Sequence, residues 1–125
     1  MTRTLNVAIV DDDDGVRASL SSLVRSLGHR VRDYGSAAAF LDALPSHAPD
    51  CLISDVQMPQ MTGEQLQAEL AAGGYPFAMV FMTGFPTPDI RRRVLAAGAC
   101  AYLDKPIDAA AIADCLARLQ AEDGR

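Results

Sequence analysis

Apolar residues gather in five short runs, and each run is followed by a longer stretch in which apolar positions recur three or four residues apart. Short continuous apolar runs are typical of strands buried on both faces, and the longer spacing is typical of helices with one apolar face. The pattern predicts strands over residues 5–10, 30–34, 50–55, 77–82 and 99–103. Polar and apolar residues alternate in 30–34, so we expect this strand nearer an edge of the sheet.

Start and stop signals place helices between these strands. Ser36 and Thr87 precede apolar stripes as N-caps, and Thr62 with Gln65 has the spacing of a capping box. Asp13 and Asp14 are acids at the start of the first helix, where they offset the helix dipole. The helical stretches run over residues of about 16–27, 36–44, 62–72, 87–97 and 112–121.

Five alternations of strand and helix favour an α/β fold with a parallel sheet and helices on both faces. Five strands are too few for an eight-stranded barrel, so we predict a doubly wound, flavodoxin-like (βα)5 sheet in the order 2-1-3-4-5. The 125 residues fit one domain, 1–125.

Composition and charge exclude several functions. The net charge of −5 argues against nucleic-acid binding by these residues, because a phosphate backbone requires an excess of Lys and Arg. No apolar run approaches the roughly 20 residues of a membrane span, and no secretory segment is present. Cys51, Cys100 and Cys115 are odd in number and widely spaced, so we expect reduced, core-filling thiols in a cytoplasmic protein.

Polar residues that could bind a metal ion or take part in a reaction follow four of the strands. Asp11 and Asp12 end the first strand and Asp55 ends the third, and these two strands are neighbours in the predicted order. Three carboxylates held together repel one another by about 1–4 kcal/mol per pair near a surface. Their oxygen ligands favour Mg²⁺ as the cation that offsets this repulsion.

The other two strand ends supply a cation and a hydroxyl. Lys105 can pair with Asp55 at rest and with a phosphoryl oxygen afterwards, and the hydroxyl of Thr83 can donate to an acyl phosphate. A carboxylate such as Asp55 is a nucleophile for phosphoryl groups. The Gly-rich phosphate loop of nucleotide-binding proteins is missing, so a nucleotide is not expected as the direct donor.

Together these motifs resemble the receiver domain of two-component response regulators over the whole chain. Val10-Asp11-Asp12, the segment Asp55-Val56-Gln57-Met58-Pro59-x-Met61-x-Gly63, Thr83-Gly84 and Lys105-Pro106 stand where that family has its acidic pair, phosphoacceptor segment, switch hydroxyl and Lys-Pro pair. The stretches 9–17 and 82–84 are most similar to receivers linked to LuxR-type DNA-binding domains.

The resemblance implies specific roles for residues. Asp55 would be phosphorylated by a sensor histidine kinase, and the metal would be held by Asp12, Asp55 and the backbone carbonyl of Gln57, with Asp11 acting through metal-bound water. Tyr102 would be an aromatic switch, and the bond before Pro106 would be cis.

The resemblance also implies how the domain signals. The domain would promote its own phosphorylation and slow dephosphorylation rather than turn over a substrate as an enzyme. Phosphorylation would change the face made by the fourth helix, fifth strand and fifth helix, through which the domain could form a homodimer. A DNA-binding output domain beyond Arg125 and a stand-alone receiver both fit the sequence.

Two other functions also fit parts of the sequence. Asp12-Asp13-Asp14-Gly15-Val16 also resembles the nucleophile motif of haloacid-dehalogenase-type phosphatases, with Asp12 and Asp14 as its acids. That hypothesis leaves the Asp55 segment unexplained, and no acidic pair follows Lys105 where further metal ligands would stand. The second alternative is a receiver that only binds proteins, although every expected acid, hydroxyl and lysine is present.

Overall fold

The computed structural model describes residues 3–123 and contains five strands that alternate with five helices. The strands are β1 (Asn6–Val10), β2 (Arg30–Tyr34), β3 (Cys51–Asp55), β4 (Ala78–Thr83) and β5 (Ala101–Asp104). The helices are α1 (Asp14–Ser26), α2 (Ala37–Ala43), α3 (Gly63–Ala72), α4 (Pro88–Ala96) and α5 (Ala109–Asp123).

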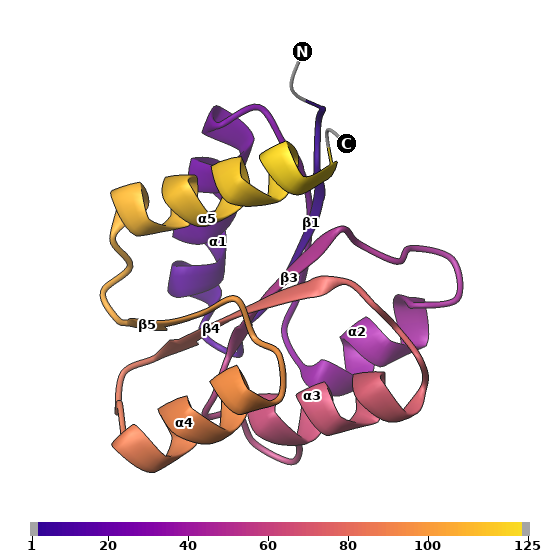
Figure 1. Ribbon diagram of the computed structural model, residues 1–125, viewed down its shortest axis with the longest axis vertical. Helices are drawn as coiled ribbons and strands as arrows, with labels where there is room; N and C mark the ends of the chain where they lie inside the picture. Colours follow the sequence, from indigo (N-terminus) through magenta and orange to yellow (C-terminus); the bar gives the residue numbers. More distant parts are fainter. Residues whose placement is uncertain (1–2, 124–125) are drawn as a thin grey trace.

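The strands form one parallel sheet in the order β2-β1-β3-β4-β5, which confirms the predicted fold class. Helices α1 and α5 cover one face, and α2, α3 and α4 cover the other (Figure 1). The order places β2 at one edge, as its alternating pattern predicted, and β3 in the centre. All five residues of β3 are buried, because helices pack on both of its faces.

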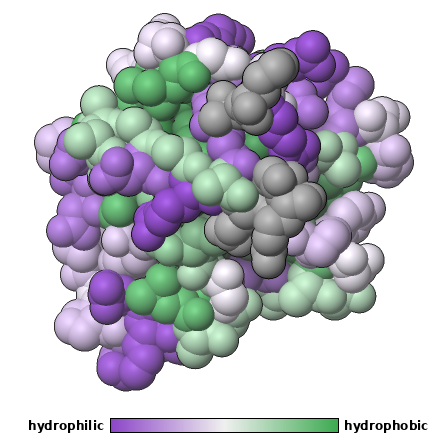
Figure 2. All heavy atoms as spheres, turned by 45° about the horizontal axis from the view of Figure 1, so that its top comes forward, coloured by the Kyte–Doolittle hydropathy of each residue, from purple (hydrophilic) through white to green (hydrophobic). Residues whose placement is uncertain are grey.

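Each face of the sheet carries its own apolar core. Phe40, Leu66 and Phe81 belong to the core under α2, α3 and α4, and Leu20, Ile53 and Leu116 belong to the core under α1 and α5. Phe81 and Ile53 point to opposite faces because successive strand residues alternate. Hydrophilic and hydrophobic residues are interspersed over the face seen in Figure 2.

The predicted helix caps are confirmed: Ser36 caps α2, Thr87 caps α4, and Thr62 forms the expected capping box with Gln65 at the start of α3. Asp13, expected only as an acid near the helix start, is the N-cap of α1. A cap satisfies backbone N–H groups that have no partner within their own helix, so these side chains fix where each helix begins. The loops that carry the strand-end residues are therefore anchored on both sides.

Helices α3 and α4 are tied to each other directly. The guanidinium of Arg93 donates to both carboxylate oxygens of Glu64, at 2.6 and 3.0 Å. Below this ion pair the buried side chain of Gln67 donates through Nε2 to the backbone oxygen of Val94 at 3.0 Å. Breaking this hydrogen bond would leave a buried amide without a partner, which costs free energy. The surface ion pair and the buried hydrogen bond therefore both hold the two helices together.

The thiols agree only partly with the expectation from sequence. None of the three cysteines forms a disulfide, and Cys51 and Cys115 are buried as predicted. The prediction that Cys100 fills the core is wrong: its residue is exposed, because it precedes β5 at the end of the loop after α4. Across residues 3–123, none of the helices combines the length and apolar character needed to cross a membrane.

Candidate functional site

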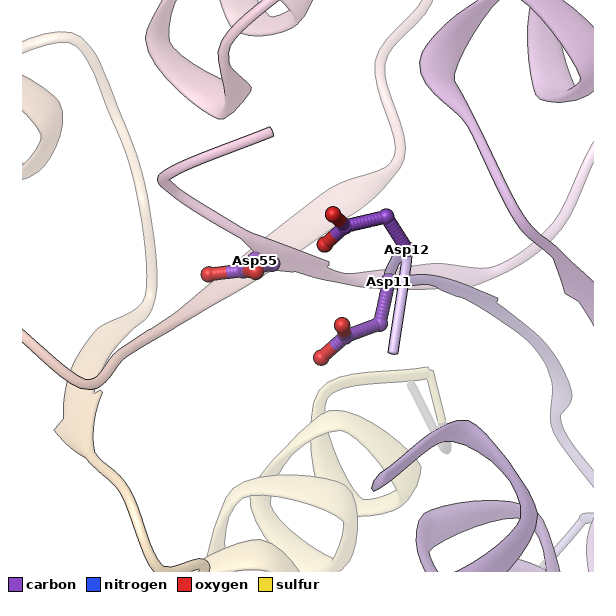
Figure 3. A group of neighbouring side chains, drawn as sticks. All are labelled: Asp11, Asp12 and Asp55. Carbon is purple, nitrogen blue, oxygen red and sulfur yellow. The ribbon is translucent and has the colours of Figure 1, made fainter. Parts of the chain in front are cut away.

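The three carboxylates singled out in the sequence meet at the carboxyl ends of β1 and β3. Asp55 is the last residue of β3, and Asp11 and Asp12 directly follow β1, whose Val10 pairs with Ser54. One oxygen from each carboxylate lies within 4.8 Å of the other two (Figure 3). Asp11 and Asp55 are buried, whereas Asp12 is exposed at the mouth of the site.

Lys105 provides the positive charge of this cluster. Its Nζ lies 3.3 Å from Asp55 Oδ2, as the sequence predicted, and 3.0 Å from Asp11 Oδ2, a contact that the sequence did not indicate. Asp11 Oδ2 is buried and receives no well-aligned hydrogen bond within residues 3–123, while Asp11 Oδ1 accepts from the backbone N–H of Asp13 at 2.9 Å. One lysine is thus shared between two buried carboxylates.

Burial and neighbouring charges shift the pKa values of Asp55 and Lys105. Burial raises the pKa of Asp55 and the neighbouring charge of Asp11 raises it further, and together these effects exceed the opposite effect of Lys105. Burial by itself would lower the pKa of Lys105, but its contacts with Asp11 and Asp55 outweigh burial and raise that pKa. The site without a further cation therefore disfavours the charged form of Asp55.

A divalent cation fits this arrangement. Oxygen atoms of three carboxylates converge, one of them is a buried oxygen without a well-aligned donor, and the exposed side of Asp12 leaves room for water ligands. Hard oxygen ligands with an incomplete shell are typical of Mg²⁺ sites. The residues that the sequence grouped by strand order are thus brought together as a candidate metal site.

Thr83, the last residue of β4, lies fully buried beside the cluster. Its hydroxyl donates to the side-chain oxygen of Gln57 at 2.5 Å and accepts from the backbone N–H of Phe85 at 2.9 Å. The backbone N–H of Gln57 donates to Asp55 Oδ1 at 3.3 Å. Gln57 therefore contacts both Asp55 and Thr83, and the contact of its side chain with Thr83 could not be seen in the sequence.

Tyr102 and Pro106 lie on either side of Lys105 in the chain. Tyr102 is half-buried on β5, and its hydroxyl accepts from the backbone N–H of Thr87 at 3.2 Å. The Lys105–Pro106 bond is cis, as the resemblance implied. The backbone N–H of Lys105 donates to the oxygen of Thr83 at 2.7 Å, which continues the strand pairing up to the lysine.

Sequence reasoning missed Arg17, which supports the acidic loop from below. Its guanidinium donates to the backbone oxygen of Asp11 at 2.8 Å, to Asp14 Oδ1 at 2.7 Å and to Asp33 Oδ1 at 3.3 Å. These contacts join α1, β2 and the loop after β1. Helical spacing puts Arg17 on the polar face of α1, and no local signal reveals a partner so distant in sequence as Asp33.

Gly63 lies directly against the end of β3. A Cβ atom at this position would lie 2.4 Å from the backbone oxygen of Asp55, 3.0 Å from the ring of Phe81 and 3.1 Å from the Cα of Val56. Real Cβ contacts do not come so close, so only glycine lets α3 begin directly against the end of β3.

The chain is similar to known proteins over most of its length. The family model described as response regulator receiver domain matches residues 7–117. The chain is 41% identical over its full length to the transcriptional regulatory protein FixJ of Azorhizobium caulinodans, covering 58% of that protein. It is 42% identical over 80% of its length to the response regulator protein TmoT of Ectopseudomonas mendocina, covering 46% of that protein.

Solved structures give the same result. The crystal structure titled FixJ-N superposes with a TM-score of 0.85 at 29% identity, covering 96% of this chain and 95% of the other. The response regulator StyR superposes with a TM-score of 0.83 at 35% identity, covering 94% of this chain and 61% of the other. The chain thus spans about half the length of the curated relatives it matches.

Proposed function

The chain belongs to the response regulator receiver domain family, and from that membership we propose that it is a phosphoacceptor switch in which Asp55 takes the phosphoryl group. The observation that carries the proposal is the meeting of Asp55 with Asp11, Asp12 and Lys105 at the carboxyl ends of the strands. Ligands of doubly wound sheets bind at this edge, beside the point where the strand order reverses.

The chemistry follows from the positions of the charges. A carboxylate oxygen of Asp55 forms a bond to phosphorus while the bond from phosphorus to the imidazole nitrogen of a phosphohistidine breaks, and the electron pair leaves with that nitrogen. Lys105 offsets charge on the phosphoryl oxygens, because its Nζ already lies 3.3 Å from Asp55 Oδ2. The same groups serve slow hydrolysis, so the domain acts on its own phosphoryl group without turning over an external substrate.

We place Mg²⁺ on Asp11, Asp12, Asp55 and the backbone carbonyl of Gln57, with Asp11 acting through water. Bound there, Mg²⁺ supplies positive charge that offsets both the carboxylates and the incoming phosphoryl oxygens. The buried Asp11 Oδ2 and the raised pKa of Asp55 support this placement, because both show carboxylate charge that Lys105 alone does not fully balance.

The read-out runs through Thr83 and Tyr102 in this proposal. The hydroxyl of Thr83 turns to a phosphoryl oxygen, and Tyr102 moves into the space beside it. Because the Tyr102 hydroxyl accepts from Thr87, the cap of α4, such a movement releases the start of that helix. The face formed by α4, β5 and α5 then changes, which biases a two-state equilibrium.

The partners follow from this role. The donor is a sensor histidine kinase, which must bring its phosphohistidine to the exposed mouth of the site. An apolar groove lined by Val16, Leu20, Leu23 and Ile107 opens between α1 and the segment after Lys105, and it is suited to an apolar helix face of the kinase. The changed α4-β5-α5 face would support a homodimer and control a DNA-binding output domain beyond Arg125, in the cytoplasm.

Incubation with acetyl phosphate and Mg²⁺ tests the site. We expect the intact mass to rise by one phosphoryl group in the wild-type protein and in Asp42→Asn, which changes an exposed carboxylate of α2, but not in Asp55→Asn. A mass gain that persists in Asp55→Asn would place the phosphoryl group elsewhere. Loss of the gain when Mg²⁺ is chelated is expected as well.

The phosphatase alternative is not favoured. The side chain of Asp14 is 91% exposed and pairs with Arg17 in the first turn of α1, outside the carboxylate cluster. Asp12 and Asp14 therefore do not form one site, and the family model matches a receiver. Steady turnover of p-nitrophenyl phosphate would reverse this conclusion.

A further inference from the structure

Two neighbours, Gln57 and Phe85, orient the hydroxyl of Thr83. A hydroxyl carries one hydrogen, and Thr83 gives it to the side-chain oxygen of Gln57 at 2.5 Å. The backbone N–H of Phe85 donates to the same hydroxyl oxygen at 2.9 Å, which leaves the hydrogen no other orientation with a partner as good. Thr83 is fully buried, so water cannot replace Gln57.

Gln57 is at the same time attached to the phosphoacceptor. Its backbone N–H donates to Asp55 Oδ1 at 3.3 Å, so its main chain and its side chain contact Asp55 and Thr83 respectively. The side-chain oxygen of Gln57 therefore accepts the hydrogen bond of Thr83 in the unmodified protein. A phosphoryl oxygen on Asp55 would have to replace it as the acceptor.

We propose that the side chain of Gln57 is a positioning residue that holds the Thr83 hydroxyl in the unphosphorylated protein and competes with the phosphoryl group for its hydrogen. This inference rests on the proposed function of Asp55. The energy gained when Thr83 donates to the phosphoryl group is reduced by the loss of its bond to Gln57. The strength of that bond thus sets how readily the modified state is reached.

Removing the acceptor should therefore favour the modified state. Gln57→Met keeps an unbranched side chain of similar length but replaces the amide by a weak acceptor, so the buried hydroxyl loses its partner only in the unmodified state. The net contribution of one neutral hydrogen bond corresponds to a factor of about 2 to 12 in an equilibrium constant. We expect an effect of that size, and we expect it only when the Thr83 hydroxyl is present.

A double-mutant cycle with beryllium fluoride, a mimic of the phosphoryl group, measures this coupling. Calorimetric titration in Mg²⁺ is carried out on wild type, Gln57→Met, Thr83→Ala and the double variant. We expect Gln57→Met to bind the mimic about 2- to 12-fold more tightly in the wild-type background and to have a clearly smaller effect in the Thr83→Ala background. A merely structural role of Gln57 would give the same factor in both.

Further titrations separate the possible outcomes. An equal factor in both backgrounds, or weaker binding by Gln57→Met, overturns the inference and leaves the proposed function intact. A wild-type protein that binds no mimic overturns the proposed function itself. The exposed Gln60→Met makes the same chemical change in the same loop and should leave binding unchanged.

Discussion

Gly63→Ala is the substitution that most directly tests how tightly α3 is fitted against the phosphoacceptor. The added methyl group would lie 2.4 Å from the backbone oxygen of Asp55, with the ring of Phe81 at 3.0 Å and the Cα of Val56 at 3.1 Å. Two of these three neighbours are backbone atoms, which cannot rotate away. Gly63 also donates its N–H to the oxygen of Val56 at 2.9 Å, so α3 cannot withdraw without losing a hydrogen bond.

The size of the effect follows from these distances. Relief to an ordinary contact of about 3.4 Å requires a separation of about 1 Å between α3 and the end of β3. Overpacking in a well-packed interior costs about 1–3 kcal/mol of stability. We expect a cost near the upper end of this range, because two of the crowded neighbours are backbone atoms. A helix usually gains up to about 1 kcal/mol when Gly becomes Ala, which offsets only part of the cost. We expect the free energy of unfolding to fall by about 2 kcal/mol, which lowers the thermal unfolding midpoint by roughly 8 °C.

Urea and thermal unfolding followed by circular dichroism measure this loss. Gly84→Ala is the matched control, because a Cβ there meets no atom within 4 Å and the backbone is not in the left-handed region. The control should stay within about 0.5 kcal/mol of wild type. The rate of phosphorylation by acetyl phosphate should also fall in Gly63→Ala, since the shift acts on the backbone of Asp55. A Gly63→Ala protein as stable and as reactive as Gly84→Ala would refute the reasoning.

Three further substitutions test titratable or charged side chains: Asp55 and Arg17 at the site, and His29 at the opposite ends of the strands. Burial raises the pKa of Asp55, so the wild-type protein loses stability as pH rises through the folded-state pKa of this carboxyl. Without divalent cation, Asp55→Asn should therefore have a higher urea midpoint than wild type at about pH 7. The difference should shrink toward about pH 4, where the wild-type carboxyl becomes protonated. Burial lowers the pKa of His29, so wild-type stability should fall as pH drops below about 6.5, and His29→Gln should flatten that fall in urea titrations. Arg17→Met removes the donor to the Asp11 carbonyl and should cost about 1–3 kcal/mol of unfolding free energy, whereas the exposed Arg92→Met should cost less than about 1 kcal/mol.

Local patterns were sufficient for the fold and for much of the site. Continuous apolar runs identified the strands because both faces of the sheet are covered, and Ser36, Thr62 and Thr87 marked helix starts because capping is a local interaction. Strand order then brought Asp11 and Asp55 together, since parallel strands end at one edge.

What the sequence could not give depends on side-chain direction across the fold. Lys105 was expected opposite Asp55, but only the three-dimensional arrangement shows that it also contacts Asp11. The bond from Thr83 to Gln57 joins residues 26 positions apart, and its existence depends on rotamers that no spacing specifies. Cys100 was expected inside because cysteine is usually buried, yet its place before β5 leaves it exposed.

The double tie between α3 and α4 limits how the molecule can change shape. Because Glu64 holds Arg93 and Gln67 holds the Val94 carbonyl, the two helices form one lever instead of two independent parts. Its α3 end is fitted through Gly63 against the carbonyl of Asp55, and its α4 end is joined to Thr83 by the short segment 84–87. A displacement at Asp55 would therefore reach the helix pair at both ends, through Gly63 at α3 and through the segment 84–87 at α4. We expect α3 and α4 to shift together, because separating them would leave the buried amide of Gln67 without its partner.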